Sequence, residues 1–188
     1  MVFAVSPGKG RPYMSSFCTC SPRELPGNLI RRIAEEWMLV TAGSPADGVA
    51  TMTVNWGAMG YLWHRDMAMV VIRHSRNTLP YMERSGGFSL SLFSPEYREQ
   101  LTFCGQNSGR DVDKIAHCGF TTAYEDGIPY FTQADTVLLC RTMYTCEIEP
   151  GRFLDRELFR RWYEEGVHKG DMHRMFLAHI QAVLQKKA

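Results

Sequence analysis

Short segments in which apolar and polar residues alternate, separated by turn-forming residues, run through most of the chain. Residues 49–56 (VATMTVNW) have the period of two that is typical of a half-buried strand, with one face made by Ala50, Met52, Val54 and Trp56. The continuously apolar residues 37–43 (WMLVTAG) predict a buried strand, and the turn residues of 44–48 (SPADG) join the two strands. A tight turn can only join antiparallel neighbours, so this part of the chain is predicted to be a hairpin.

Further strands are predicted where the same patterns recur, at 67–73, 87–93, 120–126, 128–131, 134–149 and 173–184. The last segment also has helical spacing, and we interpret it as a strand. Short helices are predicted between the strands, at 28–37 with Asn28 as N-cap, 79–86, 94–105 with Ser94 as N-cap, briefly within 105–119, and 154–166. Leu154, Leu158, Phe159 and Trp162 would supply the apolar stripe of the last helix. About six or seven strands joined mostly by turns predict a mainly β protein with short helices (α+β), arranged as an antiparallel barrel.

The length and composition exclude several classes of protein. A chain of 188 residues with 45% hydrophobic and 22% charged residues suits one compact domain. We interpret 1–25 as an N-terminal extension and 26–188 as that single domain. No apolar run reaches the roughly 18 residues that a membrane span needs, and the start of the chain lacks the features of a secretory signal. A cytoplasmic protein without membrane association is expected.

The net charge and the spacing of the cysteines limit which ligands and metal ions the chain is expected to bind. The net charge is +1 and no cluster of lysine and arginine stands out, which argues against nucleic-acid binding. The six cysteines are irregularly spaced, and we interpret them as free thiols. Cys18 and Cys20 are too close together for the usual zinc spacing, and no second cysteine or histidine pair follows, so no metal site is predicted.

Three polar patches interrupt the apolar pattern, each where a strand gives way to a turn or helix. They are Thr51, Thr53, Asn55 and Trp56; residues 73–78 (RHSRNT); and residues 108–114 (SGRDVDK). In the second patch two guanidinium groups and two hydroxyls, with the N-terminus of the next helix, could converge on a phosphate. The alternative is a solvated loop in which Ser75 or Asn77 caps that helix.

The first and third patches also have two interpretations each. Thr51, Thr53 and Asn55 could face a ligand, or could lie on the outward face of a half-exposed strand with a bulge at Trp56 and Gly57. The third patch could approach a ligand, or could be a surface loop with an N-capping aspartate and a local ion pair. The residues alone leave these alternatives open.

Several of these segments together resemble a known family. In chain order they are WMLVTAG, TMTVNWGAMGYLW, RHSRNT, FSLSLF followed by PEYREQLTFCG, SGRDVDK and HRMFLAHI. This series resembles the flavoredoxin and flavin reductase-like family of FMN-binding split barrels over roughly residues 29–184. The first twenty residues, with Cys18 and Cys20, have no counterpart in the family. The resemblance implies a six-stranded antiparallel split β-barrel that forms a homodimer and binds FMN in a groove at the subunit interface.

The resemblance also implies roles for the polar patches. The residues expected along the flavin are Thr51, Thr53, Val54, Asn55, Trp56 and Gly57, with Gly57 and Ala58 allowing close approach of the backbone. The residues expected to hold the phosphate are Arg73, Ser75, Arg76 and Thr78. Weaker candidates near the flavin are Ser108, Arg110, Asp113 and Lys114, and weaker still His173 and Arg174.

The function implied is that of an FMN-binding oxidoreductase that passes electrons from NAD(P)H or a redox protein, through FMN, to flavin or another small-molecule acceptor. The flavin performs the chemistry, so no catalytic side chain is required. Because no GxGxxG fingerprint is present, NADH or NADPH would bind only transiently against the flavin. Two alternatives remain: a non-catalytic carrier or sensor that binds FMN or haem, and a cofactor-free structural dimer.

Overall fold

Most of the strands belong to one large antiparallel sheet. The computed structural model describes residues 16–187. Seven strands follow the order β3-β2-β6-β9-β10-β5-β4, and β1 pairs with the end of β10. The strands of this sheet are β1 (Phe17–Cys20), β2 (Met38–Ser44), β3 (Gly48–Val54), β4 (Gly57–Leu62), β5 (Arg65–Arg73), β6 (Gly87–Leu92), β9 (Thr136–Glu147) and β10 (His173–Lys186). A separate hairpin consists of β7 (Thr122–Glu125) and β8 (Ile128–Phe131).

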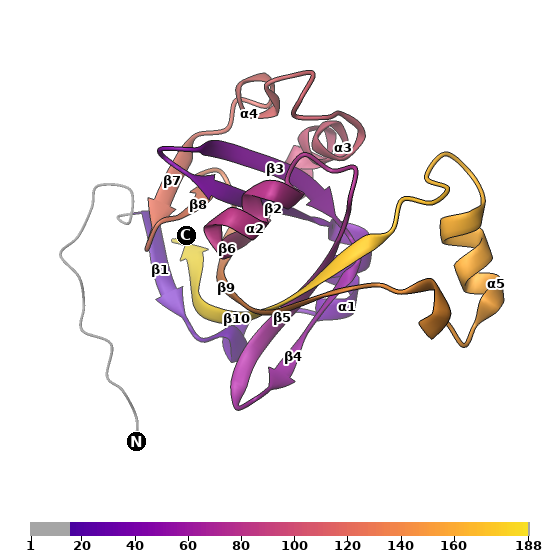
Figure 1. The fold of residues 1–188 in the computed structure, drawn as a ribbon. Coiled ribbons are helices and arrows are strands. Elements are labelled where there is room, and N and C mark those ends of the chain that lie inside the picture. Colours follow the sequence, from indigo (N-terminus) through magenta and orange to yellow (C-terminus); the bar gives the residue numbers. More distant parts are fainter. Residues whose placement is uncertain (1–15, 188) are drawn as a thin grey trace.

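The two edges of the large sheet are consecutive in the chain. The edge strands β3 and β4 are joined only by Asn55 and Trp56, and Figure 1 shows the sheet curling around its interior. The sheet has eight strands, two more than the six that the resemblance implies. One of the additional strands is β1, which belongs to the predicted N-terminal extension and pairs with β10 from Phe17 to Cys20.

The helices are short and lie between strands. They are α1 (Leu29–Arg31), which continues into the π-helical turn Arg32–Glu36, α2 (Leu79–Ser85), α3 (Arg98–Gln106), α4 (Lys114–His117), and α5 (Arg156–Phe159), which continues into the π-helical turn Arg160–Glu164. Short 3-10 turns lie at Pro22–Glu24, Pro95–Tyr97 and Pro150–Arg152. The carboxamide of Asn28 accepts from the backbone N–H of Arg31, which confirms the predicted N-cap, whereas Ser94 begins its helix without a side-chain bond. No helix of residues 16–187 is long and apolar enough to span a membrane.

The alternating pattern correctly predicted the apolar buried residues of β3, but the polar Thr51 of β3 and Ser89 and Ser91 of β6 are buried as well. Met52 and Val54 of β3 lie in the main core together with Val40, Phe88 and Leu90 of the neighbouring strands. The segment 173–184, which was ambiguous in sequence, is indeed a strand, and Phe176 and Ala178 are buried in the same core. Burial of these faces is the main contribution to the stability of the sheet.

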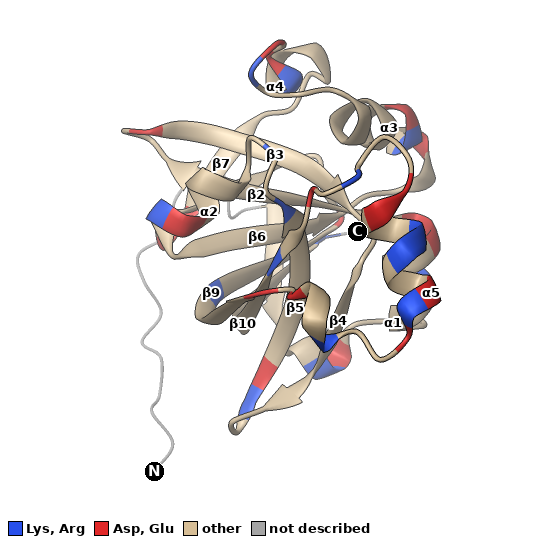
Figure 2. Cartoon of the chain, turned by 45° about the vertical axis from the view of Figure 1, so that its right-hand side comes forward, with Lys and Arg blue, Asp and Glu red and all other residues tan. Residues whose placement is uncertain are grey.

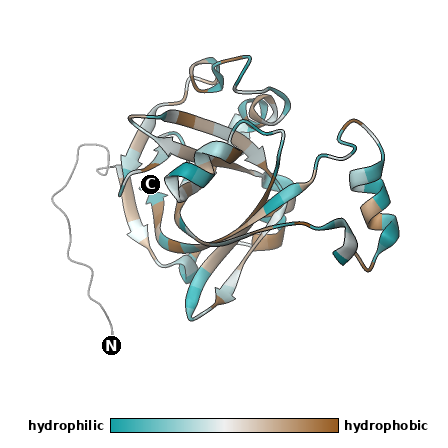
Figure 3. Cartoon of the chain, in the orientation of Figure 1, coloured by the Kyte–Doolittle hydropathy of each residue, from teal (hydrophilic) through white to brown (hydrophobic). Residues whose placement is uncertain are grey.

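The predicted apolar stripe of 154–166 was partly wrong. Leu154 is fully exposed, and Leu158 and Trp162 are partly exposed, whereas Phe159 is buried. Figure 1 shows the α5 segment standing to one side of the sheet, and Figure 3 shows apolar positions on it. The segment packs a small aromatic group of its own, Phe153, Phe159 and Tyr163, so most of the stripe has no core to face.

Candidate functional site

A groove runs along the ends of β3 and β5 and the loop that follows β5. It consists of three neighbouring cavities of about 280, 400 and 210 Å³. Arg76 lines all three, and Met52 and His168 line the first two. The 280 Å³ cavity, called the cleft below, is lined by Met52, Thr53, Val54, Asn55, Trp56, Val71, Arg73, Arg76, Trp162, His168 and His173. The structure therefore brings Thr53, Asn55 and Trp56 of the first polar patch next to Arg73 and Arg76 of the second.

Three cationic side chains in the groove are held by carbonyl oxygens. Arg73 donates to the carbonyl of Asp171 at 2.6 Å, Arg76 to that of Gly105 at 2.9 Å, and Lys114 to that of Cys104 at 2.9 Å. Arg73 and Lys114 are buried, and burial lowers the pKa of both groups. None of the ion pairs found in residues 16–187 includes these three cations. A groove of desolvated cations without a paired carboxylate favours an anionic ligand.

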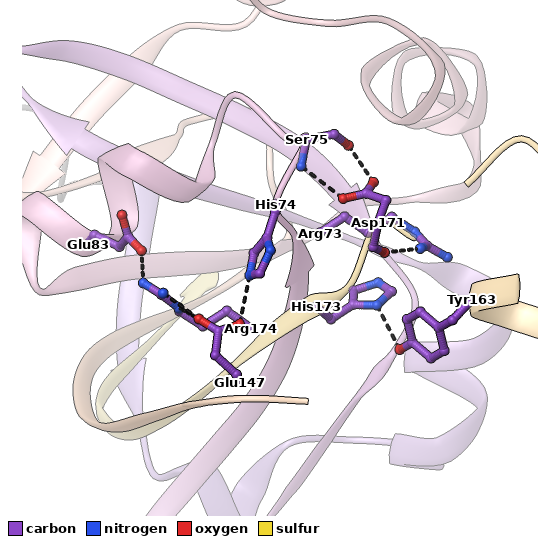
Figure 4. A network of polar contacts seen from close by, with 9 residues as sticks. All are labelled: Arg73, His74, Ser75, Glu83, Glu147, Tyr163, Asp171, His173 and Arg174. Atoms are coloured by element: carbon purple, nitrogen blue, oxygen red, sulfur yellow. Dashed lines mark hydrogen bonds and ion pairs between the residues drawn. The ribbon is translucent and has the colours of Figure 1, made fainter. Parts of the chain in front are cut away.

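Ser75 is engaged by a neighbouring carboxylate. Its backbone N–H and its hydroxyl both donate to Asp171, at 3.1 and 2.6 Å (Figure 4). The carbonyl of Ser75 accepts from Arg110 at 2.8 Å. The same close-up shows Arg174 between Glu147 and Glu83, and His74 at Glu147. Thr78 is buried at the start of α2, where its side chain makes no capping bond. Both Ser75 and Thr78 line the 400 Å³ cavity.

The residues of the first patch differ in what their side chains do. The hydroxyl of Thr51 donates to the carbonyl of Val40 at 3.0 Å, and that of Thr53 donates to the carbonyl of Leu101. These bonds hold β3 to its neighbours, although Thr53 also lines the cleft. Asn55 is exposed in the cleft wall, and Trp56 is half-buried there.

The structure gives Gly57 a role in the sheet. A Cβ atom at this position would lie 2.5 Å from the carbonyl oxygen of Met69 on β5. Glycine is therefore required because β4 and β5 approach closely at this point. The expected close approach of a ligand to this backbone stays a prediction.

The third patch lies beside the groove as predicted. Ser108, Arg110 and Lys114 line the 400 Å³ cavity, and Asp113 lines an adjoining cavity of about 490 Å³. The carboxylate of Asp113 accepts from the backbone N–H groups of Ile115 and Ala116, so this residue caps α4. The alternative of an N-capping aspartate is thus confirmed for Asp113, while the other three residues face the cavity.

Sequence reasoning missed several site residues in the segment between β9 and β10. Trp162 and His168 line the cleft, and Asp171 holds Ser75. The Tyr163 hydroxyl lies 2.9 Å from Nδ1 of His173. Burial, followed by the nearby Arg73, lowers the pKa of His173 to about 4, so its imidazole is neutral. A charged and amphipathic helical pattern gave no signal that this segment returns to the ends of β3 and β5.

The cysteine nearest to the groove is not a reactive thiol. Cys104 is buried, and its sulfur lies 3.8 Å from that of Cys118. Burial, with the neighbouring Cys118, raises the pKa of Cys104 to about 12, and the thiolate is the reactive form of cysteine. All six cysteines are free, and no group of three His, Cys, Asp or Glu within 16–187 is arranged to hold a metal ion.

The family of the chain follows from comparison with known sequences. The sequence model of the flavin reductase like domain matches residues 30–187. The chain belongs to the flavin reductase-like family. Its match begins in α1 and ends with β10, so it includes every strand of the large sheet except β1. No curated protein sequence matches the chain.

Solved structures share the fold of this flavin reductase-like chain. Flavoredoxin from Methanosarcina acetivorans is 19% identical with a TM-score of 0.62, over 81% of this chain and 69% of that one. The FMN-binding domain of a flavin reductases-like enzyme from Shewanella baltica OS155 is 14% identical with a TM-score of 0.62, over 90% and 77%. Flavoredoxin of Desulfovibrio vulgaris (Miyazaki F) is 18% identical with a TM-score of 0.61, over 87% and 78%. Because these sequence identities are all below 20%, the similarity shows a shared fold and no more.

Proposed function

We propose that this chain binds FMN in the groove and acts as an oxidoreductase of the flavin reductase or flavoredoxin type. The observation that carries the proposal is the position of Arg76, which lines all three cavities of the groove and whose guanidinium, among residues 16–187, has only a carbonyl oxygen as partner. A cation held in this way can bind a phosphate without first breaking an ion pair. The proposal includes the split-barrel homodimer and the cytoplasmic location expected from the sequence.

The residues of the groove fit the two ends of a flavin mononucleotide. The 400 Å³ cavity offers Arg76, Lys114 and Arg110 together with the hydroxyls of Thr78 and Ser108, a donor set suited to a phosphate. The cleft offers the ring of Trp56 and the side-chain amide of Asn55, a set suited to a flat ring with polar edges. Ser75 is a weaker phosphate ligand in this arrangement, because its two donors are engaged by Asp171.

The protein's own contribution is binding and orientation. Bound FMN would supply the hydride and electron transfer, with NADH, NADPH or a redox protein as donor and a flavin or another molecule as acceptor. Arg73 and Arg76 place positive charge along the groove, which attracts anionic partners. The neutral imidazole of His173 belongs to the cleft wall and has its Nδ1 occupied by Tyr163, so it adds no charge at neutral pH.

An absorbance titration tests the proposal. The purified protein is titrated with FMN, and the bound complex is then mixed anaerobically with NADH and, separately, with NADPH. A shifted flavin band that is bleached by one nicotinamide is the expected result and identifies the donor. A bound flavin that neither nicotinamide reduces would point to an electron carrier or sensor. A spectrum equal to the sum of free protein and free FMN would contradict the binding itself.

A further inference from the structure

One wall of the cleft is built by a segment outside the sheet. Residues 148–172 connect β9 to β10, and Figure 1 shows that they extend to one side of the sheet before returning. Trp162 and His168 of this segment line the cleft, opposite residues of β3 and β5. The shape of the cleft therefore depends on a part of the chain that the main core does not hold.

Contacts with the ends of β5 and β10 fix this segment in place. Tyr163 is bonded to His173 at 2.9 Å, and its carbonyl accepts from the N–H of Gly170 at 2.8 Å. Asp171 accepts from Ser75 through its carboxylate and from Arg73 through its carbonyl (Figure 4). Trp162 precedes the anchored Tyr163 in the chain, and its ring is positioned at the cleft by contact with Trp56.

The outer side of the same segment is not held by the rest of the molecule. Leu154 is 100% exposed and Val167 is 96% exposed. Figure 2 shows acidic and basic residues interspersed along α5. The contacts between this segment and the rest of the molecule are thus concentrated at the cleft. A substitution of Trp162 would therefore change the cleft directly.

Trp162 narrows the cleft by packing against Trp56. The two rings meet edge to face, with centroids 4.8 Å apart and planes at 84°, and Trp162 keeps 38% of its surface exposed. The resulting cleft of about 280 Å³ is at the lower limit of the ~300–1,000 Å³ that small-molecule sites usually offer. A second substrate that approaches a ring bound in this cleft meets the partly exposed ring of Trp162 on one wall.

We infer that Trp162 is a specificity-determining residue, which limits the part of the second redox substrate that enters the cleft to compact planar groups and excludes bulky ones. The inference rests on the proposed function, because it concerns access to the same cleft. Large aromatic side chains at a cleft mouth discriminate by shape, since a rigid ring cannot be displaced without losing its packing. The Trp56–Trp162 pair supplies that packing here.

The test uses electron acceptors of similar chemistry and increasing size. FMN-loaded protein is photoreduced without oxygen and mixed with 1,4-benzoquinone or 9,10-phenanthrenequinone. Each quinone takes up two electrons and two protons and becomes a hydroquinone, while the bound FMN returns to its oxidised form. The measured quantity is the ratio of the two second-order rates, phenanthrenequinone over benzoquinone, so the reduction potentials of the acceptors cancel between variants.

The variants are Trp162→Ala, Trp162→Phe and the matched control Leu158→Ala, one helical turn earlier and outside the cleft lining. Trp162→Ala should raise the ratio at least fivefold, Trp162→Phe about twofold because a smaller ring remains, and Leu158→Ala should leave it unchanged. If both Trp162 variants keep FMN bound and have an unchanged ratio of the two quinone rates, the inference about Trp162 is overturned while the proposed function stands. Loss of FMN from Trp162→Phe would make this residue a cofactor ligand and also overturn it. Failure of the unmodified protein to bind FMN would overturn the proposed function as well.

Discussion

The hydroxyl of Tyr163 and Nδ1 of His173 share a buried hydrogen bond of 2.9 Å, which joins the segment after α5 to the first residue of β10. Both side chains are buried, and the Trp56 ring lies 5.2 Å from that of His173. The neutral imidazole of His173 is therefore one of the groups that connect the cleft wall to the sheet, together with Asp171, which accepts from Ser75 and Arg73. Protonation of this imidazole would place a charge beside Arg73 in a desolvated site.

Acid should destabilise the protein through His173. The pKa of this group is about 4 in the folded chain and near 6.5 when unfolded. Between these two values the unfolded chain binds more protons, so the stabilising contribution is complete above pH 6.5 and is lost as the pH falls toward 4. At about 1.4 kcal/mol per pKa unit, the loss is on the order of 3 kcal/mol. Urea unfolding at a series of pH values between 7 and 4 measures it.

A neutral replacement separates His173 from the carboxylates that also titrate in acid. His173→Gln should lower stability at pH 7 and flatten the dependence between pH 6.5 and 4. His179→Gln is the matched control, because His179 lies on the same strand and its pKa is lowered by a less complete burial and by Arg65. His179→Gln should flatten the dependence of stability on pH less than His173→Gln does. Equal slopes in the unmodified protein and His173→Gln would contradict the assignment.

Gly57 should tolerate no side chain. In Gly57→Ala the new methyl group would lie 2.5 Å from the Met69 carbonyl, so β4 must shift away from β5. A clash of this kind costs about 1–3 kcal/mol. Gly60→Ala on the same strand is the control, since its nearest neighbour would be the flexible end of Met67 at 3.7 Å. Thermal or urea unfolding of both variants gives the comparison, and similar values for the two would show that β4 moves freely.

Arg76 should carry much of the affinity for FMN. Because a hydrogen bond to a charged group contributes about 1.5–3 kcal/mol, Arg76→Ala should weaken FMN binding on the order of 10- to 100-fold. Arg31→Ala removes an exposed arginine that pairs with Glu35 outside the groove, and should leave binding unchanged. Flavin fluorescence titration at constant salt measures both. The same loss in the two variants would mean that binding reflects net charge instead of a phosphate site.

The thiols should differ widely in their reaction with iodoacetamide. Cys104 and Cys140 are buried, and burial raises the pKa of both, whereas Cys18 is exposed. In the native protein at pH 8, peptide mass spectrometry should find Cys18 labelled first and Cys104 and Cys140 labelled only after unfolding. Early labelling of Cys104 would mean that α3 and α4 separate readily, and would reopen a role for this thiol at the groove.

Two hairpins show why the sequence predicted one turn and missed another. The β7–β8 hairpin turns at Asp126 and Gly127, with φ of 48° and 77°, and Asp-Gly is the usual sequence for such a turn. The β4–β5 hairpin turns at Trp63 and His64, also with positive φ of 53° and 56°. Bulky residues rarely adopt this conformation, so Trp63 and His64 did not indicate a turn and β4 was not predicted.

The site was predictable to the extent that its residues are close in sequence. Local pattern marks the polar patches at the ends of β3 and β5, the family resemblance suggested their role, and all of the first patch except Thr51 lines one groove with residues of the second. Trp162, His168 and Asp171 reach the groove through contacts nearly a hundred residues away in the chain, such as that between Asp171 and Ser75. Helical periodicity describes only how a segment is amphipathic, and gives no information about which distant strand end it contacts.

The Asp-Gly turn also supports a final prediction, because Gly127 has open space around it and only its backbone conformation requires glycine. A Cβ at Gly127 would meet no atom within 4 Å, yet its φ is +77°. Gly127→Ala should therefore cost about 1–2 kcal/mol through backbone strain alone. Gly151→Ala has equally open space without a positive φ and should be nearly neutral. Urea unfolding distinguishes the two, and equal stability would mean that the β7–β8 turn adopts another conformation in solution.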